Sequence, residues 1–163
     1  MNKKQLIRDA LLIGIVIAVI GIIYLISVLN RKPGEVATIS YSKQALFSVD
    51  LNDGKFEANT TVYEVDFKPE IKDEKLYIND ILDERLEKGN GVIVYENVYV
   101  ILGYQGYVMI EYNPINKTIK VLEETSAYNI CSTQGESKIA PIICLPNRVE
   151  ITFGKQSKLD GVI

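Results

Sequence analysis

The first pattern along the chain is a long apolar run near its N-terminus. Residues 10–29 are 20 consecutive residues without a charge, and a helix of that length rises about 30 Å, the thickness of a bilayer's hydrocarbon core. The run exceeds the apolar core of a cleaved signal peptide and continues into SVLNRKPGE without an A-x-A cleavage pattern. We therefore predict a single transmembrane signal anchor at residues 10–30, preceded by a flank at residues 1–9.

Three small residues share one face of this predicted helix. Gly14, Ala18 and Gly21 lie at positions i, i+4 and i+7. Small residues in such a row let a second membrane helix approach closely. Glycine and alanine are also common in membrane helices without any partner. Both interpretations, a helix-packing face and ordinary composition, stay open.

Beyond a short polar linker at residues 31–35, apolar and polar residues alternate with the period of a β-strand. Polar turns such as Asn52-Asp53-Gly54 separate the alternating segments. We predict a mainly β domain at residues 36–155, a small barrel or sandwich, followed by a C-terminal tail at residues 156–163. The predicted strands lie in residues 37–41, 46–51, 60–67, 91–124 (three or four strands) and 148–153.

One segment of the domain instead has the pattern of a helix. The sequence DILDERLEK at residues 80–88 places apolar residues on one face, with Asp80 as the N-cap and Gly89 at the C-terminal end. We predict one short helix there, whose inward residues are Ile81, Leu82 and Leu86.

Charge divides unevenly between the two parts of the chain. Five of the 18 basic residues but only one of the 21 acidic residues precede residue 33, so residues 33–163 carry an excess of seven acidic groups. Three basic side chains precede the apolar run and two follow it, which favours a cytoplasmic N-terminus. We expect a single-pass protein of the cell membrane with residues 1–9 in the cytoplasm and an extracytoplasmic domain. Its acidic charge disfavours a nucleic-acid partner.

Few residues suggest chemistry. The chain has no histidine, and the acidic residues Asp83, Glu84 and Glu87 fit a solvated helix face better than a metal or acid–base site. Tyrosines between residues 95 and 112 suit either strand formation or binding of a flat ligand. We predict no catalytic residues, no cofactor and no metal, and therefore a protein that is not an enzyme.

The two cysteines are the remaining candidates. Cys131 and Cys144 stand in ICSTQGESKIAPIICLPNRVEI, and two cysteines of a small domain outside the membrane usually pair. A structural disulfide here would stabilise the domain by about 3 kcal/mol. A redox-active pair is the alternative, which needs a nearby cation or helix N-terminus to activate a thiol.

A turn follows the second cysteine. Leu145, Pro146, Asn147 and Arg148 form the signature turn, in which Pro146 fixes φ and Asn147 tolerates a left-handed conformation. This turn leads the chain into the last predicted strand.

These residues carry a family resemblance. The anchor, ATISYSKQALFSVDL, YVMIEYNPINKTIKV and above all NICSTQG with IICLPNRVEI resemble the NusG domain II family, and CLPNRV is the most specific element. The likeness covers residues 36–51 and 104–154. Ser126 stands where many members have a further cysteine, and Glu136 follows Gly135 where a tryptophan is frequent.

The resemblance implies a small β domain, and some anchored relatives are linked to flavin transfer and extracellular electron transfer. The chain lacks the N-terminal domain and the KOW-type segment of NusG itself, so a role in transcription does not follow. We expect an extracytoplasmic interaction or adaptor domain that binds an envelope or membrane protein. The alternative is an accessory redox function, possible through Cys131 and Cys144.

Overall fold

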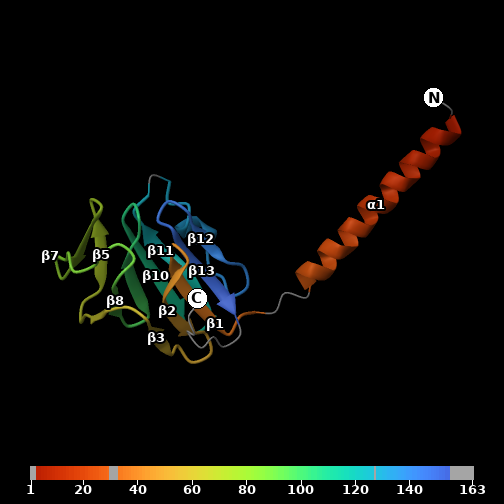
Figure 1. Ribbon diagram of the computed structural model, residues 1–163. Helices are drawn as coiled ribbons and strands as arrows, with labels where there is room; N and C mark the ends of the chain where they lie inside the picture. Colours follow the sequence, from red (N-terminus) through yellow and green to blue (C-terminus); the bar gives the residue numbers. More distant parts are fainter. Residues whose placement is uncertain (1–2, 30–32, 127, 155–163) are drawn as a thin grey trace. The chain divides into compact units, whose positions relative to one another are not determined.

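The computed structural model describes residues 3–29, 33–126 and 128–154, and the chain divides into two units between Lys32 and Pro33 (Figure 1). The first unit contains one helix, α1 (Lys3–Leu29). No helix formed by the described residues is both long enough and apolar enough to cross a membrane. The anchor at residues 10–30 and the packing face of Gly14, Ala18 and Gly21 therefore stay predictions. Residues 30–32 and the predicted tail at 156–163 lie outside the described residues.

The second unit is mainly β, as the alternation predicts, and its first sheet holds the two ends of the domain together. The first strand pairs along its whole length with the last, from Val36 opposite Gly154 to Tyr41 opposite Val149. All pairings in this sheet are antiparallel. The strand order is β12 (Ile142–Cys144), β13 (Val149–Gly154), β1 (Val36–Tyr41), β2 (Gln44–Asp50) and β3 (Phe56–Ala58).

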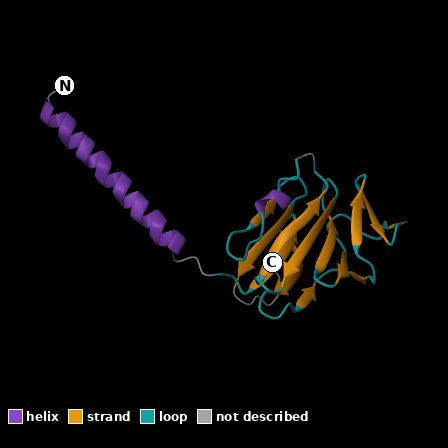
Figure 2. Ribbon diagram, turned by 180° about the vertical axis from the view of Figure 1, so that it is seen from behind, coloured by secondary structure: helices purple, strands orange, loops and turns teal. Residues whose placement is uncertain are grey.

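The second sheet contains the central strands of the domain. Its one parallel pairing joins β4 to β8, and the rest are antiparallel. The strand order is β11 (Thr118–Glu124), β10 (Tyr107–Asn113), β9 (Val98–Leu102), β8 (Val92–Tyr95) and β4 (Val62–Glu64). Both five-stranded sheets keep edge strands, so they form layers and do not close into a barrel (Figures 1 and 2).

The second sheet is covered on both faces, which explains the continuous apolar run of β9. Tyr99 and Ile101 belong to the core shared with the first sheet, whereas Val98 and Val100 belong to a second core on the opposite face. A short third sheet contributes Leu76 to that second core. Its strands are β5 (Pro69–Lys72), β6 (Lys75–Ile78) and β7 (Ile81–Leu82).

The helix predicted at residues 80–88 is wrong, because this segment begins with a β-hairpin. Asn79 and Asp80 have φ values of 52° and 60°, and two left-handed residues in succession form the tight turn that joins antiparallel strands. Ile81 therefore pairs with Ile78 in β6, and its side chain is 69% exposed. Of the three residues expected to point inward, only Leu86 is buried. The one short helix in the described part of the domain is the 3₁₀ turn η1 (Ser132–Gln134), coloured purple in Figure 2.

The tyrosines between residues 95 and 112 divide between core and surface. Tyr99 and Tyr112 are buried in the core between the two large sheets, and burial raises the pKa of Tyr99 to about 12. Tyr99 also packs against Phe47 and Phe56, with ring centroids 5.2 and 5.3 Å away. These two tyrosines are therefore core residues and not a platform for a ligand.

A buried hydrogen bond joins the two large sheets and gives a first prediction. The Tyr112 hydroxyl in β10 donates to the carbonyl oxygen of Leu51 after β2, at 3.0 Å. Replacing Tyr112 by Phe leaves that carbonyl without this donor, and we expect a loss of about 1 kcal/mol in the free energy of unfolding. Urea unfolding of the native protein and the variant measures this loss of free energy. Tyr95→Phe is the control, because the hydroxyl of Tyr95 has no hydrogen bond to another described residue, and an equal loss in both variants would contradict the assignment.

Candidate functional site

A disulfide joins Cys131 to Cys144, with the two Cα atoms 5.2 Å apart. Cys131 directly precedes η1, and Cys144 is the last residue of β12. Both side chains are almost completely buried, with exposed fractions of 0% and 1%. The bond therefore fixes the segment between β11 and β13 to the core of the domain, and a large reagent does not reach the sulfur atoms in the folded state.

A buried carboxylate touches both cysteines. Glu124 ends β11 and is 4% exposed. Its Oε1 accepts a hydrogen bond of 2.6 Å from the backbone N–H of Cys131, and its Oε2 lies 2.7 Å from Sγ of Cys144. No pattern in the sequence singles out this residue.

A β-bulge explains why Glu124 points inward. Ile110 in β10 pairs with Val121, but the neighbouring Met109 pairs with Glu123, so β11 contains one extra residue at Leu122. An extra residue inverts the alternation of side chains beyond it. Strict alternation from Val121 places Glu123 inside; the bulge exposes Glu123 and buries Glu124 instead.

Asn147 of the signature turn is fully buried and binds three other parts of the domain. Its Oδ1 accepts hydrogen bonds from the backbone N–H groups of Gln105 and Gly106, at 3.1 and 2.9 Å. Its Nδ2 donates to the carbonyl oxygen of Thr125 at 3.2 Å and lies 3.8 Å from Sγ of Cys144. This one amide therefore contacts the turn between β9 and β10, the end of β11 and the disulfide.

The rest of the signature turn lies at the surface. The N–H of Arg148 donates to the carbonyl oxygen of Leu145, which closes the turn. Arg148 has a φ of 54°, so the left-handed residue of this turn is Arg148 and not Asn147. Its guanidinium carbon lies 4.1 Å from the ring centre of Tyr104, in a cation–π contact.

The cysteine segment, residues 128–145, exposes an unusual share of apolar side chains. It holds five of the eleven large apolar side chains that are exposed within the described residues 33–126 and 128–154, among them Tyr128 at 82% and Leu145 at 78%. The other three are Ile130, Ile139 and Ile143.

The free edge of β12 is covered by a side chain. The amide of Gln134 donates to the carbonyl oxygen of Ile143 and accepts from its N–H, at 3.1 and 3.3 Å. Unpaired strand edges invite pairing with another chain. Gln134 already bonds the backbone of β12 at this edge. The groups that the edge presents to another chain are therefore the exposed side chains.

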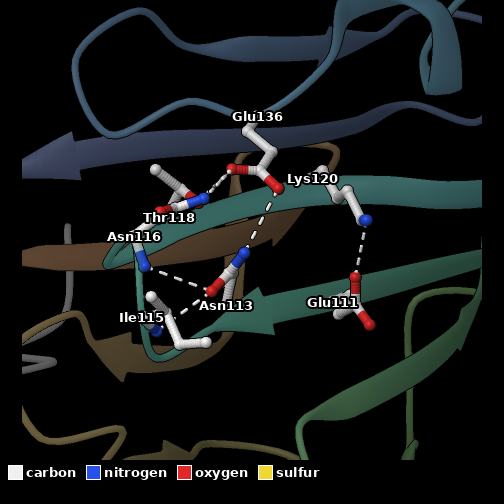
Figure 3. Close-up of polar contacts among 7 residues, drawn as sticks. All are labelled: Glu111, Asn113, Ile115, Asn116, Thr118, Lys120 and Glu136. Atoms are coloured by element: carbon white, nitrogen blue, oxygen red, sulfur yellow. Dashed lines mark hydrogen bonds and ion pairs between the residues drawn. The ribbon is translucent and has the colours of Figure 1, made fainter.

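A second polar cluster surrounds Glu136 at the turn between β10 and β11 (Figure 3). Its carboxylate accepts hydrogen bonds from the Thr118 hydroxyl at 2.8 Å and from the amides of Asn116 and Asn113 at 3.1 and 3.3 Å. The bond from Thr118, followed by those from the two amides, lowers the pKa of Glu136. This cluster holds the segment after η1 to the second sheet.

The acidic residues of segment 80–88 do not all lie on a solvated face as expected, because Asp83 is buried. Asp83 accepts a backbone hydrogen bond from Arg85 and forms an ion pair with its guanidinium at 2.6 Å. Burial opposes ionisation of Asp83, but the hydrogen bonds from Arg85 outweigh it and lower the pKa of the carboxyl group. Within the described residues, the one group with metal-ligand types close together is Glu124, Cys131 and Cys144. Because the two sulfurs are bonded to each other, that group offers no thiolate to a metal.

Ser126 has a buried hydroxyl group with no hydrogen-bond partner among the described residues.

The fold and this site define a class of protein. It is a layered β domain in which a buried disulfide, a carboxylate and an amide fix neighbouring parts of the chain to one another. Compared with known proteins, the chain matches no family model, no curated protein and no solved structure. The resemblance to the NusG domain II family is therefore a matter for proposal.

The buried amide gives a second prediction. Asn147→Ala removes the acceptor of two backbone N–H groups and the donor to Thr125, and we expect the free energy of unfolding to fall by about 2–4 kcal/mol. Thermal and urea unfolding measure this loss. Asn97→Ala, which truncates an exposed amide in another hairpin turn, is the control and should change stability by less than about 0.5 kcal/mol. Equal effects would refute a special role for Asn147.

The lowered pKa of Glu136 gives a third prediction. The folded state binds this proton less tightly than the unfolded state, so Glu136 stabilises the fold above its ordinary value of 4.5 and loses that effect as the pH falls through the folded pKa. Glu136→Gln should therefore be less stable than the native protein at neutral pH, with a difference that shrinks in acid. Urea unfolding across this pH range tests it, and a constant difference would argue against the linkage.

Proposed function

We propose that this protein is a membrane-anchored, extracytoplasmic interaction domain of the NusG domain II type. In this proposal residues 10–30 anchor the chain, and the cysteine segment binds an envelope or membrane protein. The domain has no enzymatic activity of its own. The position of basic residues around the apolar run supports this location.

The observation that carries the proposal is the set of five exposed apolar side chains in residues 128–145. Single apolar residues on a surface are ordinary, but a concentration of them marks an interaction site. The disulfide, Glu124 and Asn147 hold this segment in place. A rigid apolar surface binds a partner without the entropy loss of ordering a loop.

A redox role is the second candidate, and one observation favours it: the carboxylate of Glu124 contacts Sγ of Cys144. Burial of both sulfurs opposes direct exchange with a protein thiol. Binding through the apolar segment therefore has the stronger support.

Crosslinking on intact cells tests the interaction. A membrane-impermeant, amine-reactive crosslinker should join the full chain to a reproducible envelope or membrane protein. In Tyr128→Ser/Leu145→Ser the yield should fall by about tenfold, because two anchor side chains are lost.

Ile115→Ser is the matched control, since Ile115 is 90% exposed but lies in the β10–β11 turn. It should leave the yield unchanged. Crosslinks that form only after lysis would reverse the proposed orientation. Recovery of no partner, or equal loss in both variants, would remove the interaction proposal.

A further inference from the structure

The Cys131–Cys144 disulfide lies beside a carboxyl group that a purely structural bridge does not need. Burying a carboxyl group costs free energy unless its oxygens accept hydrogen bonds. Oε1 of Glu124 has such a bond from the N–H of Cys131. Oε2 instead faces Sγ of Cys144 at 2.7 Å, and a disulfide sulfur has no hydrogen to donate. Among the described residues, the second oxygen therefore has no donor in the bonded state that accounts for its position.

The reduced state, in which both cysteines are thiols, supplies a hydrogen-bond donor for this oxygen. A Cys144 thiol at this position donates its S–H to Oε2 of Glu124. On its other side, Nδ2 of Asn147 lies 3.8 Å from the same sulfur, where its N–H donates to a thiolate. Cys144 thus has a proton acceptor and a donor that stabilises the charge left behind. Within the described residues, Sγ of Cys131 has no corresponding polar contact.

We propose that Glu124 is the proton acceptor of Cys144 when the disulfide closes. Because Cys131 is 0% exposed in the folded domain, the first exchange takes place before the reduced cysteine segment docks: glutathione disulfide, or another small disulfide, reacts with the thiol of Cys131, which leaves a mixed disulfide there and releases one thiol. Cys144 then transfers its proton from Sγ to Oε2 of Glu124, and its sulfur attacks Sγ of Cys131. The bond between Cys131 and the glutathione sulfur breaks, and the electron pair leaves with glutathione.

The proton on Glu124 passes to the departing glutathione thiolate, which balances the reaction. Overall the two cysteines lose two electrons, and one glutathione disulfide is reduced to two thiols. The two cysteines are therefore not equivalent: Cys131 carries the mixed disulfide and Cys144 attacks. This assignment concerns the pair itself and holds whichever partner the domain binds.

The rate of closure tests the proposal. The reduced full chain in detergent micelles is mixed with glutathione disulfide, quenched in acid, alkylated and analysed by mass spectrometry, which separates dithiol, mixed disulfide and closed forms. Glu124→Gln keeps the side-chain size but removes the proton acceptor. Its closure step should be at least about tenfold slower near neutral pH, and the difference should narrow in base, where solvent generates the thiolate.

Glu123→Gln is the matched control, since its carboxylate is the exposed neighbour in the same strand. It should close at the native rate. The proposal is overturned if Glu124→Gln also closes at that rate, or if peptide mapping of the native protein places the mixed disulfide on Cys144.

The native chain provides a readout that does not depend on the folding of Glu124→Gln. With an internal proton acceptor, the closure rate rises by less than tenfold per pH unit around neutral pH. Closure through a thiolate formed by solvent alone rises by the full tenfold per unit. A full tenfold rise in the native protein overturns the role of Glu124.

Discussion

The buried amide of Asn147, between the last two strands of the first sheet, fixes that part of the chain to two loops of the second sheet. Its oxygen accepts from two backbone N–H groups of the β9–β10 turn, and its nitrogen donates to Thr125 beyond β11. Buried donors and acceptors must be paired, so each of these loops has one position relative to the others. Gly103 shows how tightly they fit, because a Cβ there would lie 2.7 Å from Cβ of Asn147.

The disulfide and Glu124 extend this constraint along the chain. Cys144 precedes Asn147 by three residues, and its bond to Cys131 carries the fixed position back across the whole cysteine segment. Glu124 then connects Cys131 to β11 through the N–H of that cysteine. Covalent and polar contacts thus hold this segment in one conformation, as apolar packing does elsewhere in the domain. The segment itself buries few large side chains, so packing alone gives it little reason to keep one conformation.

The sequence predicts most strands and turns because their signals are local. Alternation and turn residues specify β1 with β2 and β9 with β10, whatever the rest of the chain does. The predicted helix at residues 80–88 failed because pairing of β7 with β6 across the Asn79-Asp80 turn outweighs a short helical pattern. Glu124 escaped notice because the bulge at Leu122 inverts the alternation, and a bulge has no clear signal in one sequence. Asn147 was recognised as a turn residue, but its role as a buried hydrogen-bonding centre depends on the distant turn at residues 103–106.

These contacts also explain how the domain keeps apolar side chains in water. A flexible segment with five such side chains folds them against itself or the nearest apolar surface, because burial is favourable by about 25 cal/mol per Å². The cysteine segment is prevented from doing so by the disulfide, by Asn147 and by Gln134, whose amide occupies the edge of β12. Exposure of Tyr128 and Leu145 is thus imposed by contacts that lie elsewhere in the segment. Such a frame places a carboxylate and an amide in the interior, where their polar atoms need hydrogen-bond partners.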